Sequence, residues 1–562
     1  TINQLFQRSN CPILLDSSVL YYNVKKIMNK FFKLIFVLCA FCGIAKAQPA
    51  RPKLVVGLVV DQMRWDYLYR YQNRYCDGGF KRLLGEGFSY ENCRIPYIPS
   101  VTAIGHTSIY TGSVPSIHGI AGNNFMKDGK KTYCTEDNTV KPVGSNGKAG
   151  LESPRNMWCT TIGDELRIAT NDRSKVIGVA IKDRAAILPA GHHANGAYWF
   201  DPEAGKFITS SFYMDKLPAW VNNFNKQNLP KKYLSEKWNT LYPIDTYKQS
   251  TADETDYEAE VRPGVKATLP LDLPTLSKKY GYDILRSTPF GNSYTLEMAK
   301  AAIAGENLGG GNETDFLAVS CSCTDVIGHQ VGPNAVEIED TYLRLDKDFA
   351  DFFSYLDQKV GKGNYVVFLS ADHGGMNNAK FLQDRRIPAG SWDGKTAQKY
   401  LNEMLLAKYP AAGKLVTWVS NYQVFFDTQK IDSLGLDYAT IKQDVANRLK
   451  KDKAIHYAFD MEKTSIESIP EDVKFRTING YNRERSGGVQ IIMKPDFYDY
   501  GMKGTTHGSW NGYDTHIPLV FMGWSIQHGA STKPCYMTDI AATVCAMLHI
   551  QAPDGCIGEP LF

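Results

Sequence analysis

The segment from Lys53 to Val60 is a nearly continuous apolar run, rich in β-branched residues and bounded by polar side chains. A run of this length without polar alternation is typical of a strand buried on both faces, as in a parallel sheet. It ends at Asp61, and ligand sites of open α/β sheets form at the carboxyl ends of strands. Five further runs predict strands of the same kind: Val176–Ala180, Phe316–Ser320, Tyr365–Leu369, Gly488–Met493 and Pro518–Met522.

Between these runs, apolar residues recur at three- and four-residue spacing, which predicts helices. The predicted helices cover Ala103–Thr111, Ile162–Thr170, Tyr294–Ala304, Glu337–Val360, Thr396–Lys408, Tyr438–Lys450 and Thr538–His549. Strands that alternate with helices predict an α/β fold with a mostly parallel central sheet covered by helices on both faces. Two segments, about 185–291 and about 415–481, interrupt this pattern. We expect them to be insertions in a single domain that spans 48–562.

The segment 28–47 has the features of a signal peptide. Met28 begins a short basic region, an apolar run follows, and Ala45-Lys46-Ala47 forms a small-residue cleavage pattern. The apolar run is too short to span a bilayer comfortably, although a membrane anchor is the alternative. We therefore expect cleavage after Ala47 and a periplasmic or secreted protein without a stable membrane anchor. Residues 1–27 would then be upstream and non-native.

Cysteine content and charge narrow the classes of protein to consider. Of the 12 cysteines, the nine beyond the expected signal peptide are an odd number, so at least one thiol stays unpaired. Export would permit several disulfides, but the spacing does not assign them. The formal net charge of +4 over 562 residues gives no reason to expect nucleic acid as the main partner.

Three aspartates and three histidines follow predicted strands or lie in the loops behind them. They are Asp61, Asp325, His329, Asp372, His373 and His507. Carboxylate and imidazole groups are ligands that suit zinc, and six of them with one hydroxyl can fill two neighbouring sites. Two metals about 3.5–4 Å apart can bind both the attacking and the leaving oxygen in phosphoryl transfer. Because an aspartate after a strand is often only a cap or turn residue, the prediction depends on the joint occurrence.

The hydroxyl that completes this set is Thr102, which follows a proline-containing turn and opens a predicted helix. A helix N-terminus has unpaired backbone N–H groups and favours an anion beside it. A hydroxyl is a weak nucleophile unless a base or a metal lowers its pKa, and the six ligands would supply the metal. The nearby His106 and His118 are expected to be structural residues that bond the backbone.

This ordered set resembles the alkaline phosphatase superfamily, over essentially the whole chain from Lys53 onwards. In that family the first strand ends in a metal-binding Asp, and a Ser or Thr nucleophile, an Asp-x-x-x-His pair, an Asp-His pair and a late His follow. The resemblance implies an alkaline phosphatase-like fold and two Zn²⁺ per chain. It implies that the first zinc is held by Asp325, His329 and His507. It implies that the second is held by Asp61, Asp372 and His373, with Thr102 as a further ligand and as the nucleophile.

Within the superfamily the chain is most similar to the PafA-type phosphate monoesterases, which carry an Asn after the Thr nucleophile and a Lys-x-Arg pair. Asn123 matches the Asn, with Asn124 as a neighbouring alternative, and Lys182 and Arg184 match the pair. In isolation Lys-Asp-Arg is most often a solvated surface run, but this one follows a predicted strand. The three side chains would bind the phosphoryl oxygens. A dianionic monoester would suit the two cations better than a diester would.

The resemblance therefore implies an exported, zinc-dependent alkaline phosphatase that hydrolyses small-molecule phosphate monoesters through a covalent phosphothreonine intermediate. Inorganic phosphate would be the product, and we expect the protein to be a monomer. One alternative is a phosphodiesterase or nucleotide pyrophosphatase of the same superfamily, from which only Lys182 and Arg184 distinguish the chain. A second is a non-catalytic zinc-binding relative. It is disfavoured because no expected ligand and no nucleophile is missing from the sequence.

Overall fold

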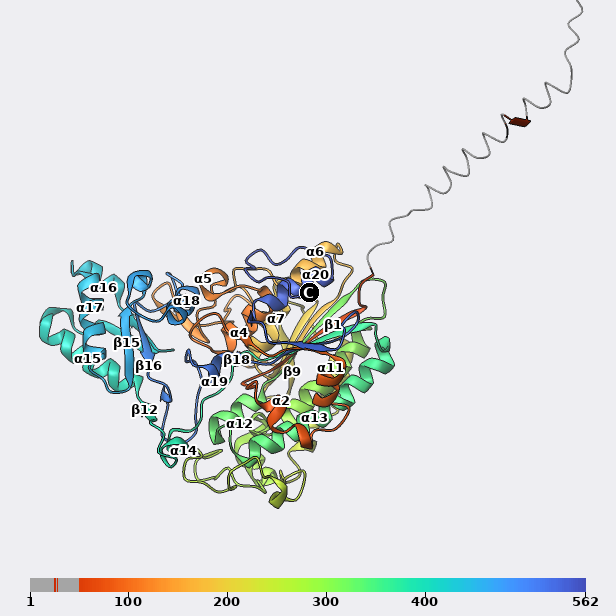
Figure 1. Cartoon of the computed structure of the whole chain (residues 1–562), viewed down its shortest axis with the longest axis horizontal. Coiled ribbons are helices and arrows are strands. Elements are labelled where there is room, and N and C mark those ends of the chain that lie inside the picture. The colour runs from red at the N-terminus through yellow and green to blue at the C-terminus, as the bar shows by residue number, and fades with distance from the viewer. Residues whose placement is uncertain (1–24, 27, 29–49) are drawn as a thin grey trace, which may run out of the picture. The chain divides into compact units, whose positions relative to one another are not determined.

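Strand β1 (Leu54–Val60) lies inside a ten-stranded sheet in the computed structural model of the chain, which describes residues 25, 26, 28 and 50–562 (Figure 1). It pairs in parallel with β10 (Asp315–Cys321) on one side and with β11 (Tyr365–Ser370) on the other. The parallel pairing continues from β10 to β7 (Val176–Ala180) and from β7 to β8 (Gly196–Asp201). All residues of β1 are buried. The predicted α/β fold with a parallel centre is thus confirmed.

Antiparallel pairs occur toward both edges of this sheet. Strand β19 (Leu519–Gly523) pairs antiparallel with β11, and β2 (Phe88–Tyr90) pairs antiparallel with β19. At the opposite edge, β9 (Lys206–Ser210) and then β6 (Pro142–Val143) also pair antiparallel. The prediction that the run at 518–522 is a strand of the same parallel kind was therefore wrong in direction. An apolar run indicates that a strand is buried but not which way it points.

Helices cover both faces of the central sheet (Figure 1). One face carries four helices: α4 (Thr102–Thr111), α6 (Ile162–Ala169), α7 (Asp183–Ala190) and α20 (Asp539–Met547). The other face carries α11 (Phe290–Glu306), α12 (Cys323–Val331) and α13 (Val336–Leu356), and α3 (Phe80–Glu86) packs between α13 and β19. Every residue of α4 is buried, because this helix lies between the sheet and the other helices of its layer. The helix that begins at Thr102 is therefore rigidly held.

A second, smaller sheet contains four antiparallel strands in the order β13 (Val416–Ser420), β14 (Gln423–Phe426), β16 (Val489–Met493) and β15 (Ile455–Asp460). Helices α15 (Gly394–Lys408) and α17 (Tyr438–Leu449) pack against it around a hydrophobic core of its own. The run at 488–493 therefore belongs to this sheet. The prediction that it is a strand of the central parallel sheet was wrong.

The two expected insertions differ from the observed additions to the central sheet. Residues 196–210, inside the segment expected at about 185–291, form β8 and β9 of the central sheet. The added part follows β9 and includes the helices α8 (Ala219–Lys226) and α10 (Leu273–Tyr280). The second addition extends from α15 to β16 and is thus wider than the expected 415–481. Residues 52–562 form one compact unit.

The N-terminal expectations fall largely outside the structure. Apart from Met28, the expected signal peptide at 28–47 lies outside the described residues. In the part of the chain that is described, no helix combines the length and the apolar character needed to cross a membrane. The nine cysteines from Cys76 to Cys556 are free thiols, and seven of them are buried.

Helix α4 approaches the end of β11 closely at Gly105. A Cβ atom at this position would lie 2.3 Å from the carbonyl oxygen of Asp372 and 2.6 Å from its Cβ. Only glycine allows backbone to approach backbone at this distance. Thr102 lies one turn earlier in α4. Its position relative to the residues after β11 therefore depends on the absence of a side chain at Gly105.

We predict that Gly105→Ala lowers the free energy of unfolding by about 1–3 kcal/mol, because the methyl group forces α4 away from β11. The matched control is Gly85→Ala in α3 (Phe80–Glu86), where nothing lies within 4 Å of the new Cβ. That variant should be unchanged or more stable by up to about 1 kcal/mol, since alanine is the better helix former. Urea unfolding of both variants checks the difference. Equal stability of the two would show that the contact is not tight.

Candidate metal centre

Three aspartates come together at the carboxyl edge of the central sheet. Asp61 directly follows β1, Asp372 lies just past β11, and Asp325 is in the first turn of α12, which follows β10. Because these three strands are parallel neighbours, their carboxyl ends meet at one edge. All three side chains are buried, with exposed fractions of 0–4%. The order of strands thus gathers three carboxylates in the protein interior.

The three expected histidine ligands share one arrangement. In each, Nδ1 is within hydrogen-bond distance of a backbone carbonyl oxygen. The carbonyl belongs to Thr505 for His329 (2.9 Å), to Gly374 for His373 (2.9 Å) and to Ser100 for His507 (2.8 Å). A carbonyl can only accept, so Nδ1 carries a proton in each ring, and Nε2 is the atom that a metal would bind. Burial opposes the charged form of His329, but the neighbouring Asp325 raises its pKa above the usual value, so a metal bound there would displace a proton from Nε2. Each Nε2 lies within 3.6 Å of an Asp325 or Asp61 oxygen. Metal-ligating histidines usually donate their other ring N–H to an acceptor of this kind, which fixes the orientation of the ring.

Among the described residues, two groups of three possible ligands have ligand atoms within 4.8 Å of one another. Asp325, His329 and His507 form the first, which is the set expected for the first zinc. The second contains Asp61, Asp325 and His373, whereas the expected set has Asp372 instead of Asp325. Asp372 lies next to this group, with Oδ2 at 3.4 Å from His373 Nε2. The two groups share Asp325 and are therefore adjacent.

The chemistry of the donor set fits divalent metals with nitrogen and oxygen ligands. Asp61 Oδ1 and Asp372 Oδ2 are buried and have no hydrogen-bond partner among the described residues. Burial lowers the pKa of His373, and it lowers the pKa of His507 well below its usual value, with His373 as a second cause. Both imidazoles are therefore held neutral, which is the form that binds metal. Unpaired carboxylate oxygens beside neutral imidazoles suit a cation of the zinc type.

Lys182 provides the positive charge at this edge. Its Nζ lies 2.6 Å from Asp61 Oδ2 and 2.6 Å from Asp325 Oδ2, and its side chain is 9% exposed. Burial opposes ionisation of Asp325, but His329 and Lys182 hold its pKa well below the usual range. Burial and the neighbouring Asp372 carboxylate instead raise the pKa of Asp61. One ammonium group thus connects the two groups of candidate ligands.

Thr102 and Asn123 meet at the start of α4. The Thr102 hydroxyl lies 3.4 Å from His373 Nε2, and its side chain is buried. Asn123 accepts a hydrogen bond through Oδ1 from the Ala103 backbone N–H at 2.9 Å. This bond places Asn123 rather than Asn124 at the helix start, beside the residue that follows Thr102. The expected nucleophile is therefore beside the candidate ligands.

Arg184 is fixed by two neighbours that the sequence patterns did not single out. The Tyr133 hydroxyl donates to Asp183 Oδ1 at 2.6 Å and accepts from Arg184 Nη1 at 2.9 Å. The side chain of Arg184 is 17% exposed, and its Nε has no hydrogen-bond partner among the described residues. Because α7 begins just after β7, Lys182 and Arg184 both lie at the same sheet edge as the aspartates. The guanidinium group is thus oriented but retains donors for an anion.

The sequence patterns did not indicate Gln62, and they indicated only part of the role of His106. Gln62 Nε2 donates to Asp325 Oδ1 at 2.6 Å, and its backbone N–H donates to Asp372 Oδ1 at 3.1 Å. The backbone of Gln62 has a φ of +62°, which allows both contacts. A positive φ at a glutamine is not predicted by any sequence motif. His106 bonds the Thr102 carbonyl oxygen at 3.0 Å, as expected of a structural residue, but also lies 3.3 Å from Asp372 Oδ2.

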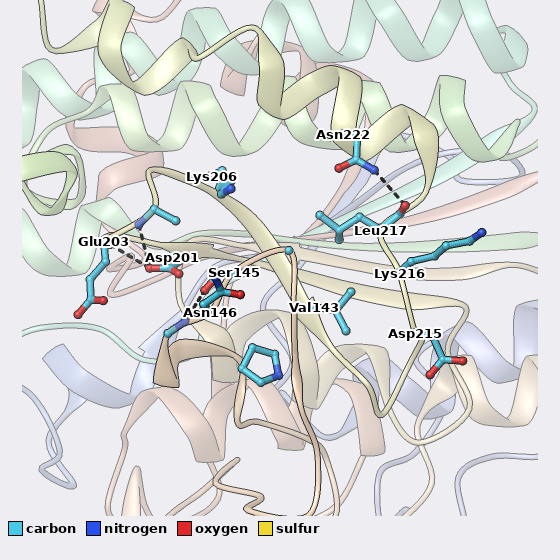
Figure 2. A pocket seen from close by; sticks show the side chains of 14 residues that line it. Val143, Ser145, Asn146, Asp201, Glu203, Lys206, Asp215, Lys216, Leu217 and Asn222 are labelled. Carbon is cyan, nitrogen blue, oxygen red and sulfur yellow. Dashed lines mark hydrogen bonds between the residues drawn. The ribbon is translucent and has the colours of Figure 1, made fainter.

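A large cavity lies elsewhere on the sheet. It has a volume of about 840 Å³ and is lined by residues of β6, β9 and the loops beside them. Figure 2 shows Asp201, Glu203 and Asp215 around it. The Asp201 carboxylate accepts hydrogen bonds from the backbone N–H groups of Glu203 (2.9 Å) and Ala204 (3.2 Å), so it stabilises a turn. None of the expected site residues lines this cavity, so the functional argument depends on the metal centre.

Comparison with known proteins gives a family match over most of the chain. The model of the type I phosphodiesterase / nucleotide pyrophosphatase family matches residues 55–514. Three curated relatives are at least 50% identical. Alkaline phosphatase PafA of Elizabethkingia meningoseptica is 50% identical (94% of this chain, 97% of the relative). Alkaline phosphatase PhoV of Synechococcus elongatus is 53% identical (92% and 94%). A Myroides odoratus protein named calcium-transporting ATPase is 50% identical (95% and 99%).

A solved structure agrees with these matches. The crystal structure of wild-type alkaline phosphatase PafA superposes with a TM-score of 0.89 at 51% identity, covering 92% of this chain and 99% of that one. A second PafA structure, also with a TM-score of 0.89, is of a variant with four substitutions. In that variant a threonine is changed to serine, and an asparagine, a lysine and an arginine are each changed to alanine.

We predict that Gln62→Leu weakens metal binding by about 10–100-fold, because the Asp325 carboxylate loses the amide that orients it. The fold should be retained, since the backbone N–H of residue 62 still reaches Asp372. Equilibrium dialysis against zinc buffers measures the change. Gln330→Leu is the matched control: its amide bonds Ser287 at 3.4 Å and touches no candidate ligand. Equal affinities of the two variants would contradict an orienting role for Gln62.

Proposed function

The chain belongs to the type I phosphodiesterase / nucleotide pyrophosphatase family and, within the alkaline phosphatase superfamily, to the PafA type; from this premise we propose that it is a zinc-dependent alkaline phosphatase with Thr102 as nucleophile. It is a phosphate monoester hydrolase, as its close relatives PafA and PhoV indicate. The proposal adds to this the metal, the covalent intermediate and the roles of individual residues.

The observation that carries the proposal is the shared setting of the three histidines. Each presents Nε2 to the carboxylates while a carbonyl oxygen fixes Nδ1. A carbonyl acceptor on Nδ1 with carboxylates beside Nε2 is the usual setting of a metal-ligating histidine, and it occurs here three times. It supports Asp325, His329 and His507 as ligands of one zinc. It supports Asp61, Asp372 and His373 as ligands of the other, with Asp325 close to both.

The residues present would carry out the reaction in two displacements. Divalent cations held here would favour ionisation of the Thr102 hydroxyl and stabilise negative charge on the leaving oxygen. Thr102 Oγ1 then forms a bond to phosphorus while the bond from phosphorus to the ester oxygen breaks, and the departing alkoxide takes up a proton. Water cleaves the resulting phosphothreonine, which releases inorganic phosphate and restores the hydroxyl. The buried N-terminus of α4 favours the phosphoryl group beside Thr102.

Three side chains would bind the non-bridging oxygens. Asn123 lies beside the helix start, and Lys182 and Arg184 supply two positive charges at the same edge. In a loose transition state these oxygens carry much of the charge, so cations placed there lower the barrier. The PafA variant combines substitutions of a threonine, an asparagine, a lysine and an arginine, the residue types of this set. That match supports carrying the roles over to Thr102, Asn123, Lys182 and Arg184.

A phosphodiesterase is the second candidate, and the description of the matching family favours it. A diester carries one negative charge and a second bulky substituent, so it would use only part of the charge that Lys182 and Arg184 offer. A monoester dianion can use both cations. We therefore propose small-molecule phosphate monoesters as the substrates, a periplasmic or secreted location after cleavage behind Ala47, and a monomeric enzyme.

We predict that Thr102→Ala lowers kcat/KM for an aryl phosphate by at least about 10³-fold, because no side chain remains to accept the phosphoryl group. Thr102→Ser should keep much of the activity, since it restores a hydroxyl. Metal analysis of both purified variants should give the same zinc content as the parent. Loss of zinc in the alanine variant would mean that Thr102 acts mainly as a ligand. Full activity in that variant would exclude it as the nucleophile.

We predict that combining Lys182→Ala with Arg184→Ala reduces hydrolysis of a phosphate monoester at least about tenfold more than hydrolysis of its methyl diester. The reason is that Lys182 and Arg184 would bind the two negative charges of the monoester, whereas the diester carries only one. Rates for both esters, measured with saturating zinc, check the ratio. A parallel fall in both rates would contradict the proposed basis of selectivity. A parent that already prefers the diester would favour the phosphodiesterase.

A further inference from the structure

The segment that carries Asn123 has no regular secondary structure. It covers residues 119–123, here called the Asn123 loop, and connects α5 (Pro115–His118) to β4 (Asn124–Lys127). Asn123 is only half-buried, and among the described residues its side chain has one hydrogen bond, to the N–H of Ala103. The position of its amide at the start of α4 therefore depends on the contacts that hold the rest of the loop.

Arg485, a residue of the second addition, bonds the chain on both sides of Asn123. It lies between α18 (Glu471–Gly480) and β16 and is 4% exposed. Its Nη1 donates to the carbonyl oxygens of Gly119 and Asn156, each at 2.6 Å, and Gly119 is the first residue of the loop. Its own carbonyl oxygen accepts from the N–H of Met126 at 3.3 Å, beyond the end of the loop. Helices α5 and α18 lie side by side at this junction (Figure 1).

The guanidinium group of Arg485 also packs against two aromatic rings. Its Cζ lies 4.7 Å from the ring centroid of Phe125 and 4.2 Å from that of Trp158. Gly119 has a φ of +78°, and a Cβ atom there would lie 2.6 Å from Trp158 Cδ2 and 2.9 Å from Arg485 Nη1. Only glycine allows the start of the loop to approach the guanidinium group so closely. Hydrogen bonds and ring contacts together fix this group in one orientation.

Arg485 keeps its positive charge although it is buried without a carboxylate partner. In the part of the chain that is described, no Asp or Glu oxygen lies within 4.0 Å of its guanidinium nitrogens, and its partners are carbonyl oxygens and ring faces. Burial lowers the pKa of Arg485 to about 10, so the group is still protonated near neutral pH. An unpaired buried cation costs free energy that an apolar side chain would avoid. What the arginine adds is a planar set of donors that holds two separate carbonyl groups at fixed positions.

The second addition touches the Asn123 loop at one more point. The hairpin between β13 and β14 turns at Asn421, whose φ of +53° asparagine accepts more readily than most residues do. A Cβ atom at Gly122, the residue before Asn123, would lie 2.6 Å from Nδ2 of Asn421. The amide of Asn421 therefore lies directly against the backbone that leads into Asn123.

We propose that Arg485 and Asn421 are positioning residues for Asn123 and that they act through the backbone of its loop. The inference rests on the proposed role of Asn123 in binding a phosphoryl oxygen. It gives the second addition a function in catalysis, because this part of the chain holds the loop on the side opposite the N–H of Ala103. A displacement of about 1 Å at such a group is enough to slow a reaction strongly.

The test is a double-mutant cycle on the full chain with saturating zinc, read as kcat/KM for an aryl phosphate. Asn123→Ala should lower kcat/KM by about 10–100-fold. Arg485→Lys keeps the charge but loses the planar set of donors, so it should lower kcat/KM by about tenfold. Added to Asn123→Ala, the same change should have less than about a twofold effect, because the group that it positions is gone. Zinc content should stay constant, since the Asn123 loop contains no candidate ligand.

A second variant and a matched control complete the test. Asn421→Gly keeps the positive φ and removes only the amide, so kcat/KM should fall by about two- to fivefold in the parent and not in the Asn123→Ala background. The control is Arg167→Lys. The Nη1 of Arg167 bonds the Ser174 carbonyl oxygen at 3.0 Å and the Asn195 side chain at 2.6 Å, and it touches no candidate site residue. Its kcat/KM should stay within about twofold of the parent.

The outcomes separate this inference from the proposed function. An equal loss of kcat/KM on Arg485→Lys with and without Asn123 would show a structural role only and would overturn the positioning role, while the role of Asn123 would stand. Unchanged kcat/KM in Asn123→Ala would remove the proposed role of Asn123 itself, and the positioning role with it. If Arg485→Lys does not fold, the cycle with Asn421→Gly decides by the same criterion.

Discussion

The mutual repulsion of Asp61, Asp325 and Asp372 is the constraint on which this structure depends. Three parallel strands deliver these carboxylates to one edge, where water is excluded and an ionised group is costly unless it is paired. Lys182 contacts two of them, and the backbone N–H groups of Gln62 and His373 contact the third. Two carboxylate oxygens still remain unpartnered among the described residues. The protein thus concentrates more negative charge than its own side chains neutralise, which is the condition for a strong cation site.

The carbonyl partners of the histidines connect loops that are distant in sequence. His507 Nδ1 bonds the carbonyl oxygen of Ser100, two residues before Thr102. The loop that contains His507 is therefore connected to the turn that positions the Thr102 hydroxyl. His329 rests on Thr505 in the same loop. Orientation of the candidate ligands and position of the candidate nucleophile are therefore coupled through main-chain atoms. Apart from the candidate ligands and Thr102 themselves, side chains in these loops would act on the site mainly through the position of the backbone.

Sequence reasoning predicted the parallel centre and the residues at its edge, and it failed where the outcome depends on tertiary context. Strands β1, β7, β10 and β11 are continuous apolar runs, so they were recognised with nearly the observed bounds. The runs of β16 and β19 look the same, but their direction and their sheet depend on partners that no local pattern encodes. Strands β8 and β9 lie in a segment rich in aromatic and polar residues, where the apolar run Ala197-Tyr198-Trp199-Phe200 is short and was not recognised as a buried strand.

For the candidate ligands, too, the sequence predicted the residues but not their arrangement. The order of Asp and His motifs along the chain indicated which residues to consider, and the structure brings all six near one edge. The sharing of Asp325 between two groups and the bridging by Gln62 could not be predicted, because both depend on distances and on a positive φ.

Charge balance explains why a Lys-x-Arg pair belongs beside such a site. Once all three carboxylates are ionised, which metal binding requires, they outnumber the cations Lys182 and Arg184 by one charge, so these side chains alone would give a phosphate dianion no net attraction. Two divalent cations would add four positive charges and so change the net charge of the site from −1 to +3. A bound monoester dianion would cancel two of these charges, and a diester would cancel only one. The site would therefore discriminate between the ester types only when the cations are present. Metal binding and preference for the dianion are, on this argument, two consequences of the same buried charge.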